Sequence, residues 1–127
     1  MRLVNGQIIS RPVLNFPFLA HYGVVADADR RIIVDYGSRG KRYVPLNIFM
    51  ATRKKYKLYD SDVLGESYEV ISAKFDLLPE KPFSWLTSNC VQFMAHFGRH
   101  DLAKQEVRKF VIFLLLLATL IYLSFQS

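Results

Sequence analysis

The chain has 127 residues, enough for one small domain and too few for several. It is 51% hydrophobic and 14% aromatic, which excludes a disordered chain, and its single cysteine excludes an intrachain disulfide. A formal charge of +6 suits nucleic acid or an anionic membrane surface as a partner, or serves only solubility. Because no nucleic-acid-binding motif accompanies the charge, we expect no nucleic-acid partner.

The N-terminal half is dominated by patterns typical of β-strands. Asp27–Arg30 separates the two strongest candidates as a turn, so these two should pair as an antiparallel hairpin. Pro45 lacks a backbone donor and restricts the last candidate to a sheet edge. The four expected strands are Gln7–Ser10, Leu19–Ala26, Arg31–Tyr36 and Tyr43–Leu46.

Helical patterns follow. Asn47–Thr52 suits a single helical turn, and Arg53–Tyr59 suits either a strand or a loop. Ser67–Leu78 predicts an amphipathic helix with Ser67 as its N-cap. Cys90–Gly98 predicts a further helix, with the preceding Asn89 as its N-cap and Gly98 at its end.

The C-terminal segment Phe110–Phe125 contains no charged residue and is apolar on all sides. As a helix it would be about 24 Å long, slightly shorter than a hydrocarbon core of about 30 Å. The alternative is a buried core helix, but a domain this small cannot surround one. The segment therefore predicts a transmembrane helix.

The flanking charges predict how this helix is oriented. Arg108 and Lys109 directly precede it, and basic residues favour the cytoplasmic side. The N-terminus is interrupted by polar residues and prolines, so it does not resemble a secretory signal. We expect a cytoplasmic domain at 1–100, a polar link at 101–109 and a single-pass membrane anchor at 110–127.

Three residues are candidates for chemistry. Cys90 follows a helix N-cap, where backbone N–H groups and the helix dipole favour a thiolate and can hold an oxyanion. His21 lies in an apolar strand, where a polar side chain needs a partner. Asp35 lies in the paired strand and can orient a histidine. The structural alternatives are a buried cysteine, a satisfied core histidine and a turn-capping aspartate.

The hairpin register decides whether His21 and Asp35 meet. A two-residue turn at Ala28–Asp29 places Asp35 opposite Tyr22 and away from the face of His21. A turn longer or shorter by one residue places Asp35 opposite His21 on the same face. A contact between the two side chains therefore requires an odd-numbered loop or a β-bulge.

Other polar residues have weaker functional interpretations. Cys90 and His96 lie six residues apart, on nearly opposite faces of a helix, which argues against a zinc site that would include His100. We expect neither a metal nor a cofactor. Beside an anchor, the following basic residues can either be solvated or meet anionic lipid head groups: Arg53, Lys54, Lys55, Lys57, Arg108 and Lys109.

Three segments carry a resemblance to a known superfamily: HYGVV at His21–Val25, IIVDYG at Ile32–Gly37 and LTSNCVQFMAHFG at Leu86–Gly98. Their order resembles the circularly permuted NlpC/P60 papain-like superfamily. The nearest likeness is to the lecithin:retinol acyltransferase-like proteins and the related small phospholipase/acyltransferases. Asp35 stands where that group usually has a second histidine, and Cys90 is followed by Val-Gln-Phe rather than Glu-His-Phe. The Asn-Cys-x-x-Phe pattern is also similar to that of the PPPDE thiol peptidases.

The resemblance implies an α+β fold, a permuted papain-like arrangement in which a small antiparallel sheet packs against helices. It implies Cys90 as nucleophile, His21 as base and Asp35 as the residue that orients it. Asn89 and Tyr22 would lie at the oxyanion site. The implied substrate is an acyl ester of a membrane lipid, so that the lipid is both substrate and anchor. A peptidase or amidase and a catalytically inactive, membrane-anchored interaction module are the alternatives.

Overall fold

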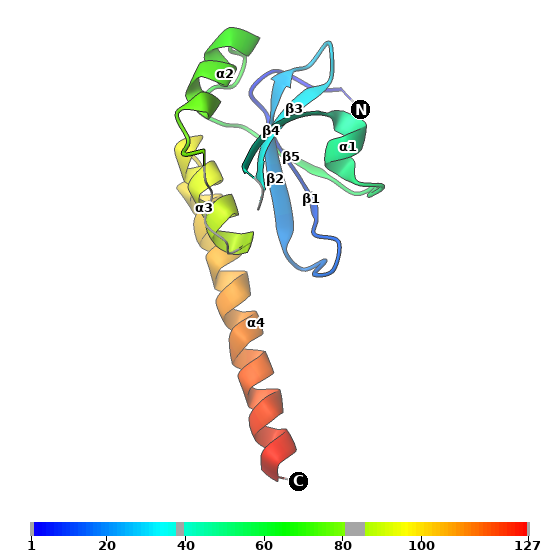
Figure 1. The fold of residues 1–127 in the computed structure, drawn as a ribbon, viewed down its shortest axis with the longest axis vertical. Coiled ribbons are helices and arrows are strands. Elements are labelled where there is room, and N and C mark those ends of the chain that lie inside the picture. Colours follow the sequence, from blue (N-terminus) through cyan, green and yellow to red (C-terminus); the bar gives the residue numbers. More distant parts are fainter. Residues whose placement is uncertain (1, 38–39, 81–85, 127) are drawn as a thin grey trace.

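The computed structural model describes residues 2–37, 40–80 and 86–126, with the backbone alone at 86–89. Its described elements form an antiparallel sheet in the order β4-β3-β2-β1-β5 with helices on both faces (Figure 1). The strands are β1 (Ile8–Pro12), β2 (Ala20–Asp27), β3 (Ile32–Gly37), β4 (Gly40–Pro45) and β5 (Lys57–Tyr59). The helices are α1 (Leu46–Met50), α2 (Tyr68–Asp76), α3 (Leu86–His96) and α4 (His100–Gln126).

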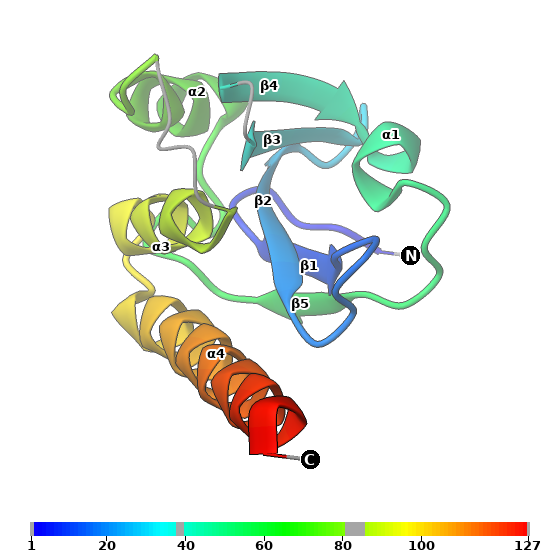
Figure 2. The same ribbon diagram turned by 60° about the horizontal axis from the view of Figure 1, so that its bottom comes forward.

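The sheet lies between two helical layers of different size. Figure 2 shows α2, α3 and α4 on one face and the short α1 on the other. Side chains alternate between the two faces along a strand. In β2, Tyr22 and Val24 therefore join the apolar cluster with α2–α4, whereas Val25 packs in the cluster that contains Phe49 of α1. The observed class is α+β with a small antiparallel sheet, as expected.

Most of the expected elements are present with small shifts at their ends. The side chain of Ser67 accepts a hydrogen bond from the amide of Val70, which confirms Ser67 as the N-cap of α2. β4 lies at the sheet edge and ends at Pro45, as the missing donor of proline requires. The segment Arg53–Tyr59, for which the sequence allowed either a strand or a loop, contains β5. Leu58 of β5 pairs with Ile9 of β1.

The expected start of the cysteine helix is wrong. α3 begins at Leu86, so Asn89 lies inside the helix rather than at its N-cap. The preference of asparagine for a cap amounts to only about 1 kcal/mol. The segment from Leu86 to Asn89 contains neither proline nor glycine to stop a helix. Cys90 is the fifth residue of α3, beyond the first four backbone N–H groups that a helix leaves unpaired.

α4 joins the domain to the apolar tail without a break. Residues 101–109 form its first turns, and Leu102, Ala103 and Glu106 are buried against the domain. The helix then extends far beyond the sheet, with most of its apolar side chains exposed (Figure 1). It is long and apolar enough to cross a membrane.

Gly23, in the middle of β2, allows the sheet and α1 to pack closely. A Cβ atom there would lie 2.6 Å from Cγ2 of Ile33 and 2.8 Å from Cε1 of Phe49. We expect Gly23→Ala to lower the free energy of unfolding by about 1–3 kcal/mol, because neither neighbour can move without disturbing the core.

Gly37→Ala is the matched control. Gly37 ends β3, and beyond its chain neighbours no atom of the described residues lies within 4 Å of the position that its Cβ would take. We expect a change below about 0.5 kcal/mol. Denaturant unfolding of the full chain in detergent micelles, followed by near-UV circular dichroism, measures both changes. Equal losses in the two variants would contradict the packing described for Gly23.

Candidate active site

The register between β2 and β3 places Asp35 on the face of His21. Asp35 pairs with Gly23, two residues from His21 along β2, so both side chains project from the side of the sheet that α1 covers. A register shift between Val25 and Asp27, followed by the Asp27–Ile32 pair, produces this arrangement. Of the two registers that the sequence left open, the one with a β-bulge is therefore observed, and Asp35 lies diagonal to His21 rather than directly opposite it.

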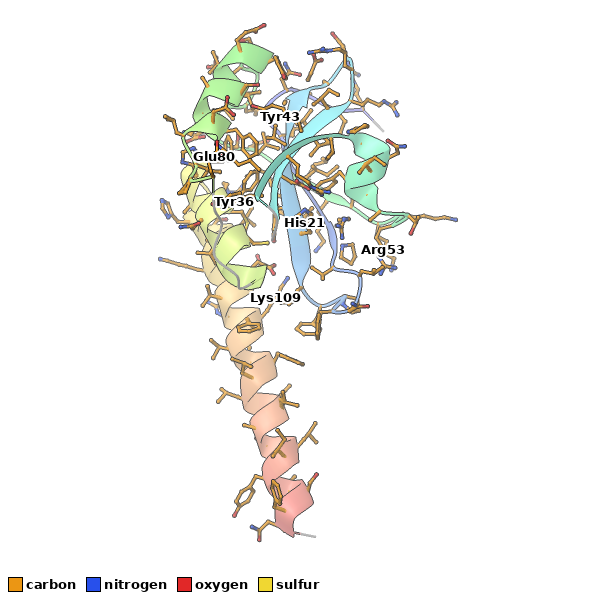
Figure 3. All side chains as sticks on the ribbon, in the orientation of Figure 1. His21, Tyr36, Tyr43, Arg53, Glu80 and Lys109 are labelled. Atoms are coloured by element: carbon orange, nitrogen blue, oxygen red, sulfur yellow. The ribbon has the colours of Figure 1, made fainter. Side chains whose placement is uncertain are left out.

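The predicted contact between the two side chains is present. Nε2 of His21 lies 2.9 Å from Oδ2 of Asp35 (Figure 3 shows His21 on β2). Because an ionised carboxylate only accepts hydrogen bonds, Nε2 is the donor, and in a neutral imidazole Nδ1 is then the acceptor. Within the described residues, Nδ1 has no hydrogen-bond partner. The ring stacks on Phe49 at 5.4 Å between centroids, which fixes its plane.

Asp35 is buried and held by a second partner. Arg42 of β4 donates from Nε to Oδ1 at 2.9 Å and from Nη2 to Oδ2 at 2.6 Å. Burial raises the pKa of Asp35, but the hydrogen bonds from His21 and Arg42 outweigh it and hold the pKa below its usual value. Asp35 is therefore ionised at neutral pH. Sequence reasoning missed Arg42 because its pairing with Asp35 depends on the register of an edge strand.

Cys90 is buried and its thiol is protonated. Its Sγ atom donates to the carbonyl oxygen of Ala20 at 3.7 Å. Burial and the negative charge of Glu106 raise the pKa of Cys90 to about 12, although a hydrogen bond from the Tyr22 amide acts in the opposite direction. The expectation of a thiolate stabilised at a helix start is therefore wrong, because Cys90 lies in the second turn and out of water.

The sulfur of Cys90 occupies an open edge of β2. β2 pairs with β3 only as far as Gly23 and Asp35 in the described register. Nearer the start of β2, the backbone of Ala20 and Tyr22 is therefore left to contact Cys90. These two residues flank His21 in sequence. Among the described residues, no hydrogen bond joins Cys90 to His21 itself.

Glu106 is a buried acid that sequence reasoning missed. Its carboxylate accepts from the hydroxyl of Tyr22 at 3.0 Å, from the amide of Ala20 at 3.3 Å and from Nζ of Lys109 at 3.0 Å. A carboxylate with three donors can be buried in its charged form. The sequence carries one signal that Glu106 is buried, namely its helical spacing from two apolar residues. Glu106 follows Leu102 by four residues and Ala103 by three, so all three lie on one face of the helix.

Tyr22 and Asn89 were expected at the oxyanion site. The hydroxyl of Tyr22 donates to Glu106, on the α2–α4 side of the sheet and away from the face of His21 and Asp35. Its backbone amide, not its side chain, is the group near the sulfur of Cys90. The side chain of Asn89 lies outside the described part of the structure.

The expected basic residues lie in three different environments. Lys54, Lys55 and Lys57 are exposed and, with Lys109, border a pocket of about 440 Å³. The guanidinium of Arg53 donates to the carbonyl of Leu14. Arg108 is exposed on α4, and Lys109 also pairs with Glu106.

No protein-family model matches the chain, and no curated protein and no solved structure matches it either.

The ionised state of Asp35 predicts a pH-dependent contribution to stability. Its pKa is lowered in the fold, so its contribution is complete above the ordinary aspartate pKa of about 3.9 and is lost as the pH falls below it. We expect Asp35→Asn to reduce the loss of stability between about pH 5 and pH 3. Urea unfolding at several pH values measures this, with the exposed turn variant Asp29→Asn as control. An unchanged pH dependence in Asp35→Asn would contradict the ion pairs.

The protonated thiol predicts slow alkylation. At pH 8 we expect iodoacetamide to modify Cys90 more than about a hundredfold more slowly than free cysteine, with the rate rising at higher pH. Glu106→Gln should accelerate the reaction, because it removes a negative charge that raises the pKa of the thiol. The exposed Glu69→Gln is the control, and near-UV circular dichroism checks that each variant is folded. A rate equal to that of free cysteine would contradict the buried, neutral thiol.

Proposed function

We propose that this protein is a membrane-anchored thiol acyltransferase or hydrolase that acts on an acyl ester of a membrane lipid. One observation carries the proposal. His21, which bonds to Asp35 of β3, belongs to β2, and the backbone of the residues on either side of it contacts the sulfur of Cys90. A histidine oriented by a carboxylate next to a cysteine is the arrangement that nucleophilic acyl transfer requires. The permuted papain-like arrangement is part of this proposal.

In the first step, Cys90 is activated during the attack rather than beforehand, because its thiol is neutral at rest. Transfer of the thiol proton to Nδ1 of His21 requires a rearrangement that brings the sulfur, which packs in the cluster on the α2–α4 side, to the His21 ring on the α1 side. The sulfur then bonds to the ester carbonyl carbon while its proton passes to Nδ1. Asp35 stabilises the resulting imidazolium. The backbone amide of Tyr22 supplies a donor beside the reacting sulfur.

In the second step, the tetrahedral intermediate collapses. The bond between carbon and the leaving alcohol breaks, and the alcohol takes the proton from His21, which leaves an acyl thioester on Cys90. Water or a second acceptor then attacks the thioester and gives its proton to His21. The carbon–sulfur bond breaks, and the proton returns to the sulfur. Hydrolysis and acyl transfer differ only in this acceptor.

The position of α4 supports a lipid as the substrate. Glu106 accepts from the amide of Ala20, whose carbonyl accepts from the thiol of Cys90. Glu106 lies four residues, about one helical turn, before the uncharged segment that begins at Phe110. With α4 across the bilayer, Cys90 would lie close to the depth of the lipid ester groups. We infer that the domain faces the cytoplasm, because basic residues precede the span.

A second candidate is a catalytically inactive interaction module. The raised pKa of Cys90 and the thiol bond to Ala20 instead of His21 favour it. In that case the bonds of Asp35 to His21 and Arg42 would only stabilise the fold. A peptidase or amidase would use the same residues and differ only in substrate.

An active-site probe separates the enzymes from the inactive module. We expect a lipid-like fluorophosphonate to label the full chain in detergent micelles at Cys90. Cys90→Ser and His21→Ala should abolish labelling, and Asp35→Asn should slow it by about 10²–10⁴-fold, the usual contribution of acid–base catalysis. The exposed His100→Ala is the matched histidine control and should label normally.

The same variants identify the substrate class. Phosphatidylcholine vesicles should release fatty acid with the unchanged chain and not with Cys90→Ser. Labelling without fatty-acid release, together with cleavage of a peptide library, would indicate a peptidase. An unlabelled chain with an intact near-UV spectrum would contradict both enzyme proposals and favour the interaction module.

A further inference from the structure

The loop between β1 and β2, residues 13–19, carries unusually exposed apolar side chains. Leu14, Phe16 and Phe18 are 60%, 41% and 42% exposed. The rings of Phe16 and Phe18 contact the ring of Phe113 on α4, with centroids 6.0 Å and 5.0 Å apart. The tip of the loop thus lies beside the start of the apolar part of α4.

The length of α4 sets the depth of this loop. Phe113 lies three residues, about 4.5 Å, beyond the start of the uncharged segment at Phe110. A boundary further toward the C-terminus would leave apolar residues that follow Phe110 outside the hydrocarbon core, which costs free energy. If α4 crosses the bilayer, Phe16 and Phe18 therefore lie at or below the boundary of its hydrocarbon core.

A basic pocket opens next to the loop. It has a volume of about 440 Å³, and its walls include Phe18 of the loop and Lys109 of α4. Its other cations are Arg11 of β1 and the lysines at 54, 55 and 57. Its described lining contains no carboxylate. Aromatic side chains add an apolar wall, as an amphiphile with an anionic head group would need.

The loop and the basic segment are joined into one surface. Nη2 of Arg53 donates to the carbonyl of Leu14 at 2.8 Å. Figure 3 shows Arg53 and Lys109 toward the end of the domain from which α4 extends. Glu106, which bonds to residues that line the pocket, is paired with Lys109. Positive charge therefore borders the apolar loop at the level where a bilayer would present its phosphates.

We propose that this surface docks on the bilayer, with loop 13–19 inserted beside α4 and an anionic phospholipid head group in the basic pocket. The proposal rests on the membrane anchor of the proposed function and adds a second attachment with a lipid preference. Two attachments prevent the domain from pivoting on α4, and they hold the Ala20 end of β2 toward the membrane. Each exposed lysine contributes about a fivefold preference for an anionic surface.

Depth-dependent quenching tests the insertion. The single tryptophan, Trp85, is replaced by phenylalanine, and one new tryptophan is introduced by Phe18→Trp, Ile48→Trp or Tyr122→Trp. Each full-length variant is reconstituted in phosphatidylcholine vesicles with brominated acyl chains. We expect strong quenching for Phe18→Trp and Tyr122→Trp, and little for Ile48→Trp, which is exposed on α1. Bromine near the head group should quench Phe18→Trp more than bromine deep in the chain.

Three outcomes would overturn the insertion, and they differ in meaning. Quenching of Tyr122→Trp but not Phe18→Trp would reject the docking and leave the anchor. If neither tryptophan is quenched, both the docking and the membrane anchor are rejected. Protection of Phe18→Trp from aqueous acrylamide without lipid quenching would mean that protein covers the loop. Fluorophosphonate labelling of Cys90 reports catalysis separately in every case.

Brominated phosphatidylglycerol tests the anionic head group. At equal brominated fraction, it should quench Phe18→Trp more than brominated phosphatidylcholine does. Replacing the lysines at 54, 55 and 57 by glutamine should remove this excess and leave the phosphatidylcholine quenching unchanged. The matched control replaces Arg2, Arg30 and Lys41 by glutamine and removes equal charge away from the pocket. Equal quenching by both lipids, or an excess that survives the lysine change, would overturn the head-group site.

Discussion

The register shift between Val25 and Asp27 is the constraint on which the site depends. Side chains alternate along a strand, so a shift of one residue would move Asp35 to the opposite face of the sheet. With the observed register, Asp35 reaches His21 on the α1 side and also meets Arg42 of β4. The carboxylate stays ionised although it is buried, because both partners bond to it. The buried pair of His21 and Asp35 thus follows from one irregularity in β2.

Glu106 connects that sheet to the apolar helix. It bonds to the backbone and the side chain of β2 at Ala20 and Tyr22, and it pairs with Lys109 on its own helix. Its negative charge also contributes to keeping Cys90 protonated. Glu106 therefore joins α4 to β2 and also affects the reactivity of the thiol. In the proposed function, this coupling would bring lipid ester groups and the cysteine to the same depth.

Local patterns predicted much of the fold and less of the site. Alternating apolar residues, Ser67 and Pro45 correctly indicated strands, a helix cap and an edge strand, because each acts through its own neighbours. The start of α3 was wrong because the weak capping preference of Asn89 was taken as decisive. The contact between His21 and Asp35 was predicted only conditionally, since a bulge has no clear local signal. Arg42 and Glu106 reach the site through sheet register and helix packing, which no short segment of sequence encodes.

The formation of an acyl thioester on Cys90 tests the central claim most directly. The full chain is incubated with phosphatidylcholine vesicles, stopped in acid and weighed intact by mass spectrometry. The account predicts an added fatty acyl mass that neutral hydroxylamine removes and that is absent in Cys90→Ser and His21→Ala. A folded chain that never gains this mass, while releasing no fatty acid, would contradict it.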